Sequence, residues 1–182
     1  MVLLMGIAGS GKGTQGKLLG AILKHTVIST GDLLRSYGSE EQHARMHKGE
    51  ILGDDEVTEL LDKALSSLDH PGDTILDGYP RTLSQAEWLV SEKNSNRFKV
   101  RYVLHLEASR EAVKARLQGR ARADDHDRAI EARFNDYERS TLPILEFYRK
   151  IGVRVIEVNA EQPIEDVHQE LLAIDYTQRK KA

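Results

Sequence analysis

Gly6-Ile7-Ala8-Gly9-Ser10-Gly11-Lys12-Gly13-Thr14 is the stretch that decides the fold of this chain of 182 residues. An apolar run, Val2–Met5, precedes it, and a helical pattern of apolar residues begins at Leu18. A glycine-rich turn between a buried strand and a helix N-terminus attracts anions, because its backbone N–H groups converge on phosphate oxygens and the helix dipole adds positive potential. Lys12 extends from such a turn to the outer phosphates of a nucleotide as a point charge. The stretch therefore predicts a phosphate-binding loop.

One position departs from the usual form of such loops, in which Ser or Thr directly follows the lysine and offers a hydroxyl to Mg²⁺. Here Gly13 follows Lys12, and Thr14 comes one residue later. The alternative interpretation is a glycine-rich turn that binds no ligand. The spacing, the preceding strand and the following helix favour the phosphate-binding loop. By itself the loop indicates a nucleotide and leaves the reaction open.

Composition excludes several classes of protein. The length suits one α/β domain, and 40% hydrophobic with 30% charged residues is typical of a globular protein in water. A net charge of −3 gives no overall attraction to nucleic acid or to an anionic membrane. The absence of cysteine excludes a disulfide and a thiolate zinc site, and no apolar run approaches ~18 residues. We expect a cytoplasmic protein without a nucleic-acid or membrane partner.

The chain alternates between strand-like and helical patterns. Five short apolar runs are typical of strands: Val2–Met5, Thr26–Ser29, Thr74–Leu76, Val100–Leu106 and Val153–Val158. Helical patterns separate all of them, which predicts βαβ units and a five-stranded parallel sheet with helices on both faces. The clearest helix starts at Asp54 and should end at Pro71, while residues 92–96 are typical of a surface loop. The expected fold class is the three-layer α/β fold of P-loop NTPases.

Two connections are too long for a single crossover helix, which needs about a dozen residues. Residues 30–73 have the pattern of at least two helices, and residues 107–152 have a basic helix, a polar break and another long helix. Extra helices in a crossover predict small subdomains over the carboxyl edge of the sheet, where α/β proteins bind ligands.

Polar blocks follow two of the predicted strands. Thr30–Arg35 follows the second strand, and Asp77–Thr82, with Gln85 shortly after, follows the third. Parallel strands bring their carboxyl ends to one edge, so these blocks should surround the same cleft as the loop. Arg35 and Arg81 are suited to grip a second phosphate group by bidentate contacts. Asp77 has the position of a carboxylate that organises Mg²⁺, through water; the alternative is an ordinary polar turn.

With these blocks the chain closely resembles the adenylate kinase family along essentially its whole length. The resemblance rests on four blocks in the family's order: Gly9–Thr14 with Gln15, Thr30–Arg35, Gly49–Leu52, and Asp77–Thr82 with Gln85-Ala86. It implies the reaction ATP + AMP ⇌ 2 ADP with Mg²⁺ as cofactor, a monomer, and a five-stranded core with an AMP-binding flap and a lid.

The implied parts of the single domain are a core at 1–29, 60–115 and 127–182, a helical flap for the nucleoside monophosphate at 30–59, and a lid at 116–126. Only Ala121, Arg122 and Ala123 separate Arg120 from Asp124, so the chain resembles the kind with the shortest lid, without a zinc site.

Matched positions carry over the family's site residues. The implied catalytic residues are Lys12, Arg81, Arg120, Arg122 and Arg133. The implied ATP-binding residues are Gly9, Ser10, Gly11, Lys12, Gly13, Thr14, Arg116, Arg120 and Gln162. The implied AMP-binding residues are Thr30, Arg35, Glu50, Ile51, Leu52, Gly78, Tyr79, Pro80, Arg81, Gln85, Arg122 and Arg133, with Gln85 reading the adenine edge.

The alternative interpretation of the later arginines is a solvated, salt-bridged helix surface, since acidic residues are interspersed among them. Arg128 and Arg139 match nothing in the family and are expected to be surface charges. The adjacent pair Asp124-Asp125 either positions Arg122 or organises Mg²⁺. The seven histidines show no ligand spacing and no nucleophile partner, so we expect them to be structural or at the surface.

Two other functions remain open from the sequence. A UMP/CMP kinase shares the loop and an Asp-Gly-x-Pro-Arg block, but that family usually has Ala at the position of Thr30 and Asn near Gln85. Thr30 with Gln85 therefore favours AMP. A nucleotide-binding regulatory protein without catalysis has no need of Arg35, Arg81 and Arg133 together.

Overall fold

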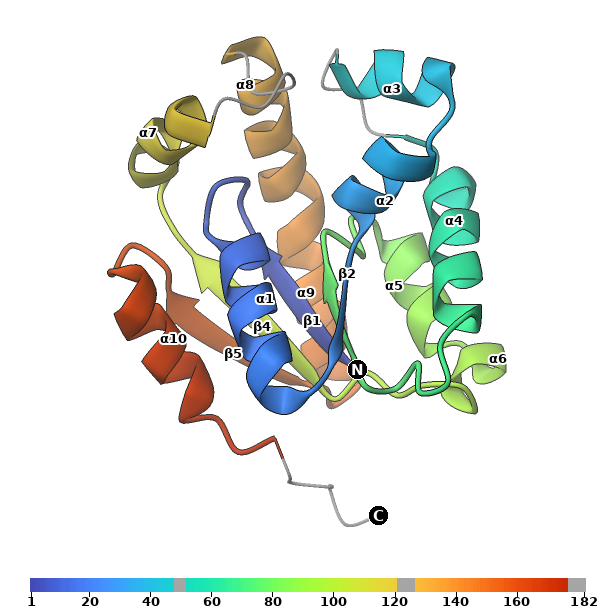
Figure 1. Cartoon of the computed structure of the whole chain (residues 1–182). Helices are drawn as coiled ribbons and strands as arrows, with labels where there is room; N and C mark the ends of the chain where they lie inside the picture. The colour runs from blue at the N-terminus through green and yellow to red at the C-terminus, as the bar shows by residue number, and fades with distance from the viewer. Residues whose placement is uncertain (48–51, 121–126, 177–182) are drawn as a thin grey trace.

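The computed structural model describes residues 1–47, 52–120 and 127–176. The sheet has the strand order β2-β3-β1-β4-β5, and every adjacent pair is parallel (Figure 1). Its strands are β1 Val2–Gly6, β2 Thr26–Ser29, β3 Thr74–Asp77, β4 Tyr102–Glu107 and β5 Arg154–Asn159. The predicted fold class and all five predicted strands are confirmed, with boundaries that differ by at most two residues.

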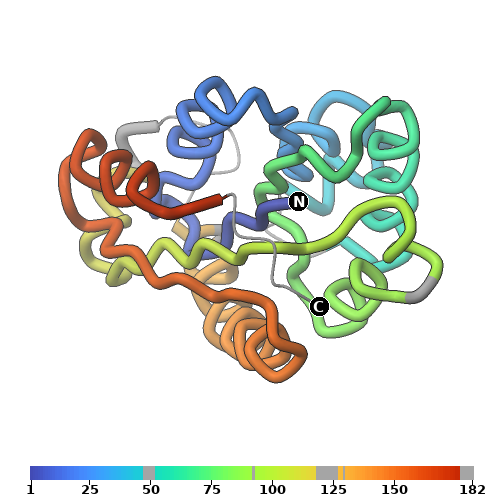
Figure 2. Tube along the Cα trace, turned by 90° about the horizontal axis from the view of Figure 1, so that it is seen from below, coloured from blue at the N-terminus to red at the C-terminus, as the bar shows by residue number. Residues whose placement is uncertain are grey.

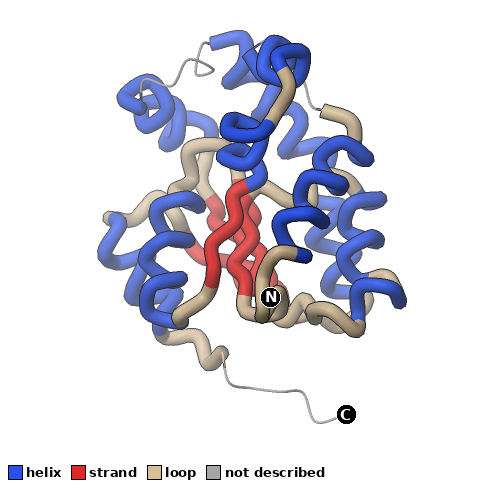
Figure 3. The backbone as a smooth tube through the Cα atoms, turned by 45° about the vertical axis from the view of Figure 1, so that its right-hand side comes forward, coloured by secondary structure: helices blue, strands red, loops and turns tan. Residues whose placement is uncertain are grey.

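Helices cover both faces of the sheet (Figure 3). They are α1 Lys12–Leu23, α2 Thr30–Tyr37, α3 Glu40–His47, α4 Asp54–Ser66, α5 Leu83–Val90, α6 Glu92–Ser95, α7 Arg110–Arg120, α8 Asp127–Asp136, α9 Leu142–Lys150 and α10 Ile164–Leu172, with a π-helical turn η1 at Tyr137–Thr141. None of the helices within the described ranges has the length and apolarity needed to cross a membrane.

Strand alternation divides the core between the two faces. Leu3 and Val103 point to one side, where they pack in a cluster with Leu145 of α9. Leu4 and Leu104 point to the other side, where α1 and α10 cover them. Figure 2 shows α1 and α10 on one side of the sheet and α9 on the other.

Helix α1 lies close to the sheet because it presents glycine to the strands. A Cβ atom at Gly16 would come within 2.9 Å of Leu4 Cδ1, and one at Gly20 would come within 2.5 Å of Val27 Cγ2. This close packing places the N-terminus of α1, and the glycine loop before it, over the carboxyl end of β1.

The extra helices of the two long connections stand beyond the carboxyl ends of the strands. The β2–β3 connection contains α2, α3 and α4, and the β4–β5 connection contains α7, α8, η1 and α9. In Figure 1 α2 and α3 lie opposite α7 and α8 above the sheet. The prediction of at least two helices between residues 30 and 73 is confirmed, and the two helical stretches expected between residues 107 and 152 appear as α7 and as the succession α8, η1 and α9.

Two local predictions were wrong. Residues 92–96 are not a loop, because α6 forms there and buries Asn94, whose Nδ2 donates to the carbonyl of Trp88 at 2.8 Å. Helix α4 ends at Ser66 rather than at Pro71, although Leu68 still packs against the core. For residues 92–96 the buried Asn94 accounts for the difference, which local patterns do not report.

Candidate active site

A cavity of about 1130 Å³ opens at the carboxyl edge of the sheet. Every predicted site residue whose side chain is described lines it, namely Gly9–Thr14, Thr30, Arg35, Leu52, Asp77–Arg81, Gln85, Arg116, Arg133 and Gln162. Glu50, Ile51 and Arg122, with Asp124 and Asp125, lie outside the described residues, as does the side chain of Arg120. One cavity therefore joins the blocks that the sequence places far apart.

The glycine loop has the backbone that its sequence requires. Gly9 and Gly11 have φ angles of +88° and +96°, in the left-handed region that L side chains rarely adopt. A Cβ at Gly9 would also meet Leu117 Cγ at 2.9 Å. Lys12 Nζ donates to the carbonyls of Gly6 and Ile7 at 2.8 and 2.9 Å, so its ammonium group lies against the start of the glycine loop.

Asp77 lies directly beside this loop. It ends β3 next to β1, and a Cβ added to Gly13 would be 3.6 Å from Asp77 Oδ2. The missing side chain at Gly13 therefore leaves space between the carboxylate and the loop, and Thr14, which carries a hydroxyl, also lines the cavity. Carboxylate, hydroxyl and phosphate oxygens are the ligands that Mg²⁺ prefers, so these residues fit a hydrated Mg²⁺ ion.

A second cluster forms around the carbonyl of Gly78. This carbonyl accepts hydrogen bonds from Thr30 Oγ1 at 2.9 Å and from Arg81 Nε at 3.0 Å. Gly78 has a φ of +82°, and a Cβ there would come within 2.9 Å of Thr30 Oγ1. The buried Thr30 thus joins the start of α2 to the turn after β3, and the Gly78 carbonyl that it contacts also orients the guanidinium of Arg81.

Positive charge is concentrated at this end of the cavity. Desolvation by the neighbouring protein atoms lowers the pKa of Arg81, although the residue as a whole is exposed. Asp77 opposes this shift, whereas the charges of Arg133 and Arg35 add to it. Arg35 Nη2 is 2.5 Å from Asp32 Oδ1. Several guanidinium groups around one space favour an anion with several oxygens, such as a phosphate.

Gln85 connects the start of α4 to the turn that carries Arg81. Its Oε1 accepts from the backbone N–H of Arg81 at 2.7 Å, and its Nε2 donates to Asp54 Oδ1 at 3.0 Å. Asp54 also accepts from the hydroxyls of Thr82 and Ser84. In this arrangement the buried amide of Gln85 lines the cavity and holds the first residue of α4 against α5.

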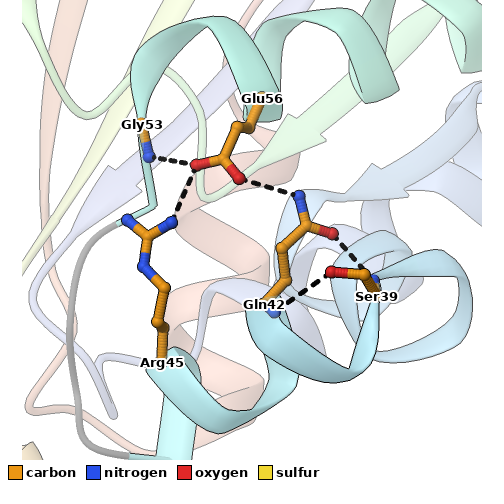
Figure 4. A network of polar contacts seen from close by, with 5 residues as sticks. All are labelled: Ser39, Gln42, Arg45, Gly53 and Glu56. Atoms are coloured by element: carbon orange, nitrogen blue, oxygen red, sulfur yellow. Dashed lines mark hydrogen bonds and ion pairs between the residues drawn. The ribbon is translucent and has the colours of Figure 1, made fainter.

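A network of hydrogen bonds joins α3 to the start of α4, on either side of residues 48–51 (Figure 4). Glu56 accepts from the N–H of Gly53 at 2.8 Å, from Gln42 Nε2 at 3.2 Å and from Arg45 Nη1 at 3.1 Å. The Gly53 N–H is the largest of the causes that lower the pKa of Glu56. One carboxylate therefore ties α3 to the start of α4.

At the opposite end of the cavity, α7 is joined to the segment after β5. Arg116 donates to the carbonyls of Ala160 and Glu161 at 2.8 and 3.2 Å, and Gln162 Nε2 donates to the carbonyl of Asn159 at 3.1 Å. Arg116 thus has a structural role in addition to lining the cavity.

Sequence reasoning missed two acidic residues of the site. Asp136 lines the cavity and acts electrostatically on Arg81, while Asp54 holds Gln85. Asp136 is three residues from Arg133 on one helix, a spacing that places both on one face and would have identified it. Asp54 offered no such signal, since an acidic residue in a first helical turn is already explained by the helix dipole. Arg139, expected at the surface, is 77% exposed.

Comparisons with known proteins agree with this geometry. A family model described as Adenylate kinase matches residues 4–153. A curated protein named Adenylate kinase from Rhodopirellula baltica is 36% identical over 174 residues, which cover 92% of this chain and 90% of the relative. Another of that name from a Synechococcus species is 38% identical over 184 residues, which cover 95% of this chain and 94% of the relative. The chain belongs to the adenylate kinase family.

Proposed function

We propose that the chain transfers the terminal phosphoryl group of ATP to AMP and forms two ADP, reversibly and with Mg²⁺. The observation that carries this proposal is that one cavity is lined both by the glycine loop and by Arg35, Arg81 and Arg133. Because the loop and the arginines can each bind a phosphate in the same cavity, a phosphate oxygen of one nucleotide can be aligned with the terminal phosphorus of the other.

Lys12 and the loop N–H groups hold the outer phosphates of ATP in this mechanism. Arg81 and Arg133, with Arg120 and Arg122 from matched positions, neutralise the charge on the transferred group. The attacking atom is a phosphate oxygen of AMP, which is largely ionised at neutral pH because its second pKa is about 6. No general base is therefore needed, and positioning with charge neutralisation accounts for the catalysis.

Asp77 would hold Mg²⁺ through water beside the phosphates, with Gly13 leaving the space and the Thr14 hydroxyl close by. When bound, the ion neutralises charge on the phosphate oxygens that it contacts. We further propose that the protein acts as a cytoplasmic monomer on free nucleotides, without nucleic acid or membrane, and that phosphoryl transfer needs no zinc.

AMP is expected to be the preferred acceptor among nucleoside monophosphates, because Thr30 and Gln85 both line the cavity next to Arg81. Initial rates of ADP formation from Mg-ATP, measured side by side with AMP, CMP and UMP, check this expectation. AMP should give the highest kcat/KM. Faster turnover of either pyrimidine nucleotide would assign the chain to the UMP/CMP kinases instead.

A further inference from the structure

Three side chains with metal-binding atoms meet outside the nucleotide cavity. His105 and Glu107 are two residues apart on β4 and therefore point to the same face of the sheet. Glu157 of β5 is the register partner of His105. One ligand atom from each side chain lies within 4.8 Å of the others. A nitrogen and two carboxylate oxygens thus converge near the edge of the sheet.

The imidazole of His105 is buried although one of its nitrogens has no hydrogen bond. The residue is 2% exposed, and Nδ1 has no hydrogen-bond partner among the described residues. The nearest carboxylate oxygen, Glu107 Oε1, lies 3.5 Å from Nδ1. Because a buried polar atom without a partner costs free energy, its presence indicates a ligand for that atom.

The other ring nitrogen is already oriented. His105 Nε2 is 2.5 Å from the hydroxyl of Tyr137, and the two rings are stacked. When Nε2 carries the proton and donates to this hydroxyl, the lone pair of Nδ1 is available to a cation. Metal-binding histidines usually have their second nitrogen held in this way.

Space for a metal-bound water adjoins the cluster. A shallow cavity of about 430 Å³ is lined by His105, Glu107 and Tyr137. The two carboxylates are 54% and 52% exposed, so they can turn toward an ion while His105 stays fixed. Three protein ligands with one open position is a common arrangement for zinc.

We propose that His105, Glu107 and Glu157 form a binding site for a divalent transition metal of the zinc class. Imidazole combined with carboxylates favours Zn²⁺ over Mg²⁺, which prefers oxygen ligands alone. The site is separate from Asp77 and from the Mg²⁺ that accompanies ATP. Its ligands come from neighbouring strands that are distant in sequence, which is why histidine spacing along the chain gave no sign of it.

Arg149 of α9 competes with a metal for one ligand. Its Nη2 lies 2.5 Å from Glu157 Oε1, and its Nη1 lies 3.7 Å from Glu146 Oε2. A bound cation takes over the neutralisation of Glu157, so the guanidinium must move away. Removing Arg149 is therefore expected to strengthen metal binding. If Glu107 and Glu157 only stabilised the fold, removing Arg149 would not strengthen it.

The test titrates Zn²⁺ by calorimetry into the chelator-treated full chain without nucleotide. Glu107→Gln and Glu157→Gln, both at exposed positions, should each weaken binding about tenfold or more. Glu146→Gln, a matched control that also removes a carboxylate near Arg149, should leave it unchanged, and Arg149→Gln should strengthen it. In nitrogen NMR spectra, Zn²⁺ should shift the Nδ1 signal of His105.

The proposal is wrong if millimolar Zn²⁺ gives no heat and leaves His105 Nδ1 unshifted. It is equally wrong if Glu107→Gln and Glu157→Gln bind Zn²⁺ as tightly as the unchanged chain and the control Glu146→Gln do, because the ion then sits elsewhere. Neither outcome bears on phosphoryl transfer, which uses the other cavity.

Discussion

Replacing Lys12 by Met is expected to lower kcat by about 10³-fold or more with little change in the folded structure. Methionine has a similar length but carries no charge, so the glycine loop loses the cation that it offers to the phosphates. The lost interaction strengthens in the transition state, and for this reason kcat should fall more than the affinity for ATP. Initial rates over a range of Mg-ATP concentrations separate the two effects.

Lys63→Met is the matched control for this substitution. Lys63 lies on α4, is 71% exposed and pairs only with Glu59 among the described contacts, so its replacement should leave kcat unchanged. Circular dichroism and thermal unfolding of both variants exclude misfolding as the cause of any loss. A Lys12→Met enzyme that keeps most of its activity would contradict phosphoryl transfer at the glycine loop and would favour a nucleotide-binding protein without catalysis.

Replacing Arg81 by Lys should lower kcat/KM for AMP by about 10²-fold or more, although the positive charge is retained. A lysine cannot reproduce the planar fork that grips two phosphate oxygens together. Lysine also has no Nε to donate a hydrogen bond to the Gly78 carbonyl. In the unchanged protein this bond orients the guanidinium of Arg81 in the cavity. Titration of AMP at saturating Mg-ATP measures the loss.

Arg97→Lys tests whether any change of guanidinium to ammonium has this effect. Arg97 bonds to Asp62, Asn94 and Ser66 and does not line the cavity. Its replacement should cost stability but not kcat/KM. Equal losses of kcat/KM in the two variants would mean that Arg81 acts through folding rather than on the phosphates.

Most of the fold could be predicted from the sequence because its strands are short apolar runs with clear boundaries. Val2–Met5 ends at a glycine loop, and Thr74–Leu76 ends at a polar block. The order of strands along the chain, combined with the rule that parallel strands share a carboxyl edge, then brings Thr30, Asp77 and Arg81 to the loop. The structure describes these residues around one cavity, as expected.

Contacts that depend on tertiary packing could not be predicted in this way. Asn94 is buried and donates to the carbonyl of Trp88, and a helix forms where a loop was expected. The polar residues of this segment give no sign of that burial. The role of Asp54 depends on the distance between α4 and α5. The register between β4 and β5, which places His105 opposite Glu157, follows from sheet geometry rather than from a spacing in the sequence.

A crystal structure with a dinucleotide inhibitor, in which a chain of phosphates joins two adenosines, tests the central claim most directly. We predict that one molecule of inhibitor occupies the single cavity, with its phosphates lying between Lys12 and Arg81 and an adenine at each end. An inhibitor that binds with one of its adenosines outside this cavity, or an Arg81 directed into bulk solvent, would contradict transfer between two nucleotides in this cleft.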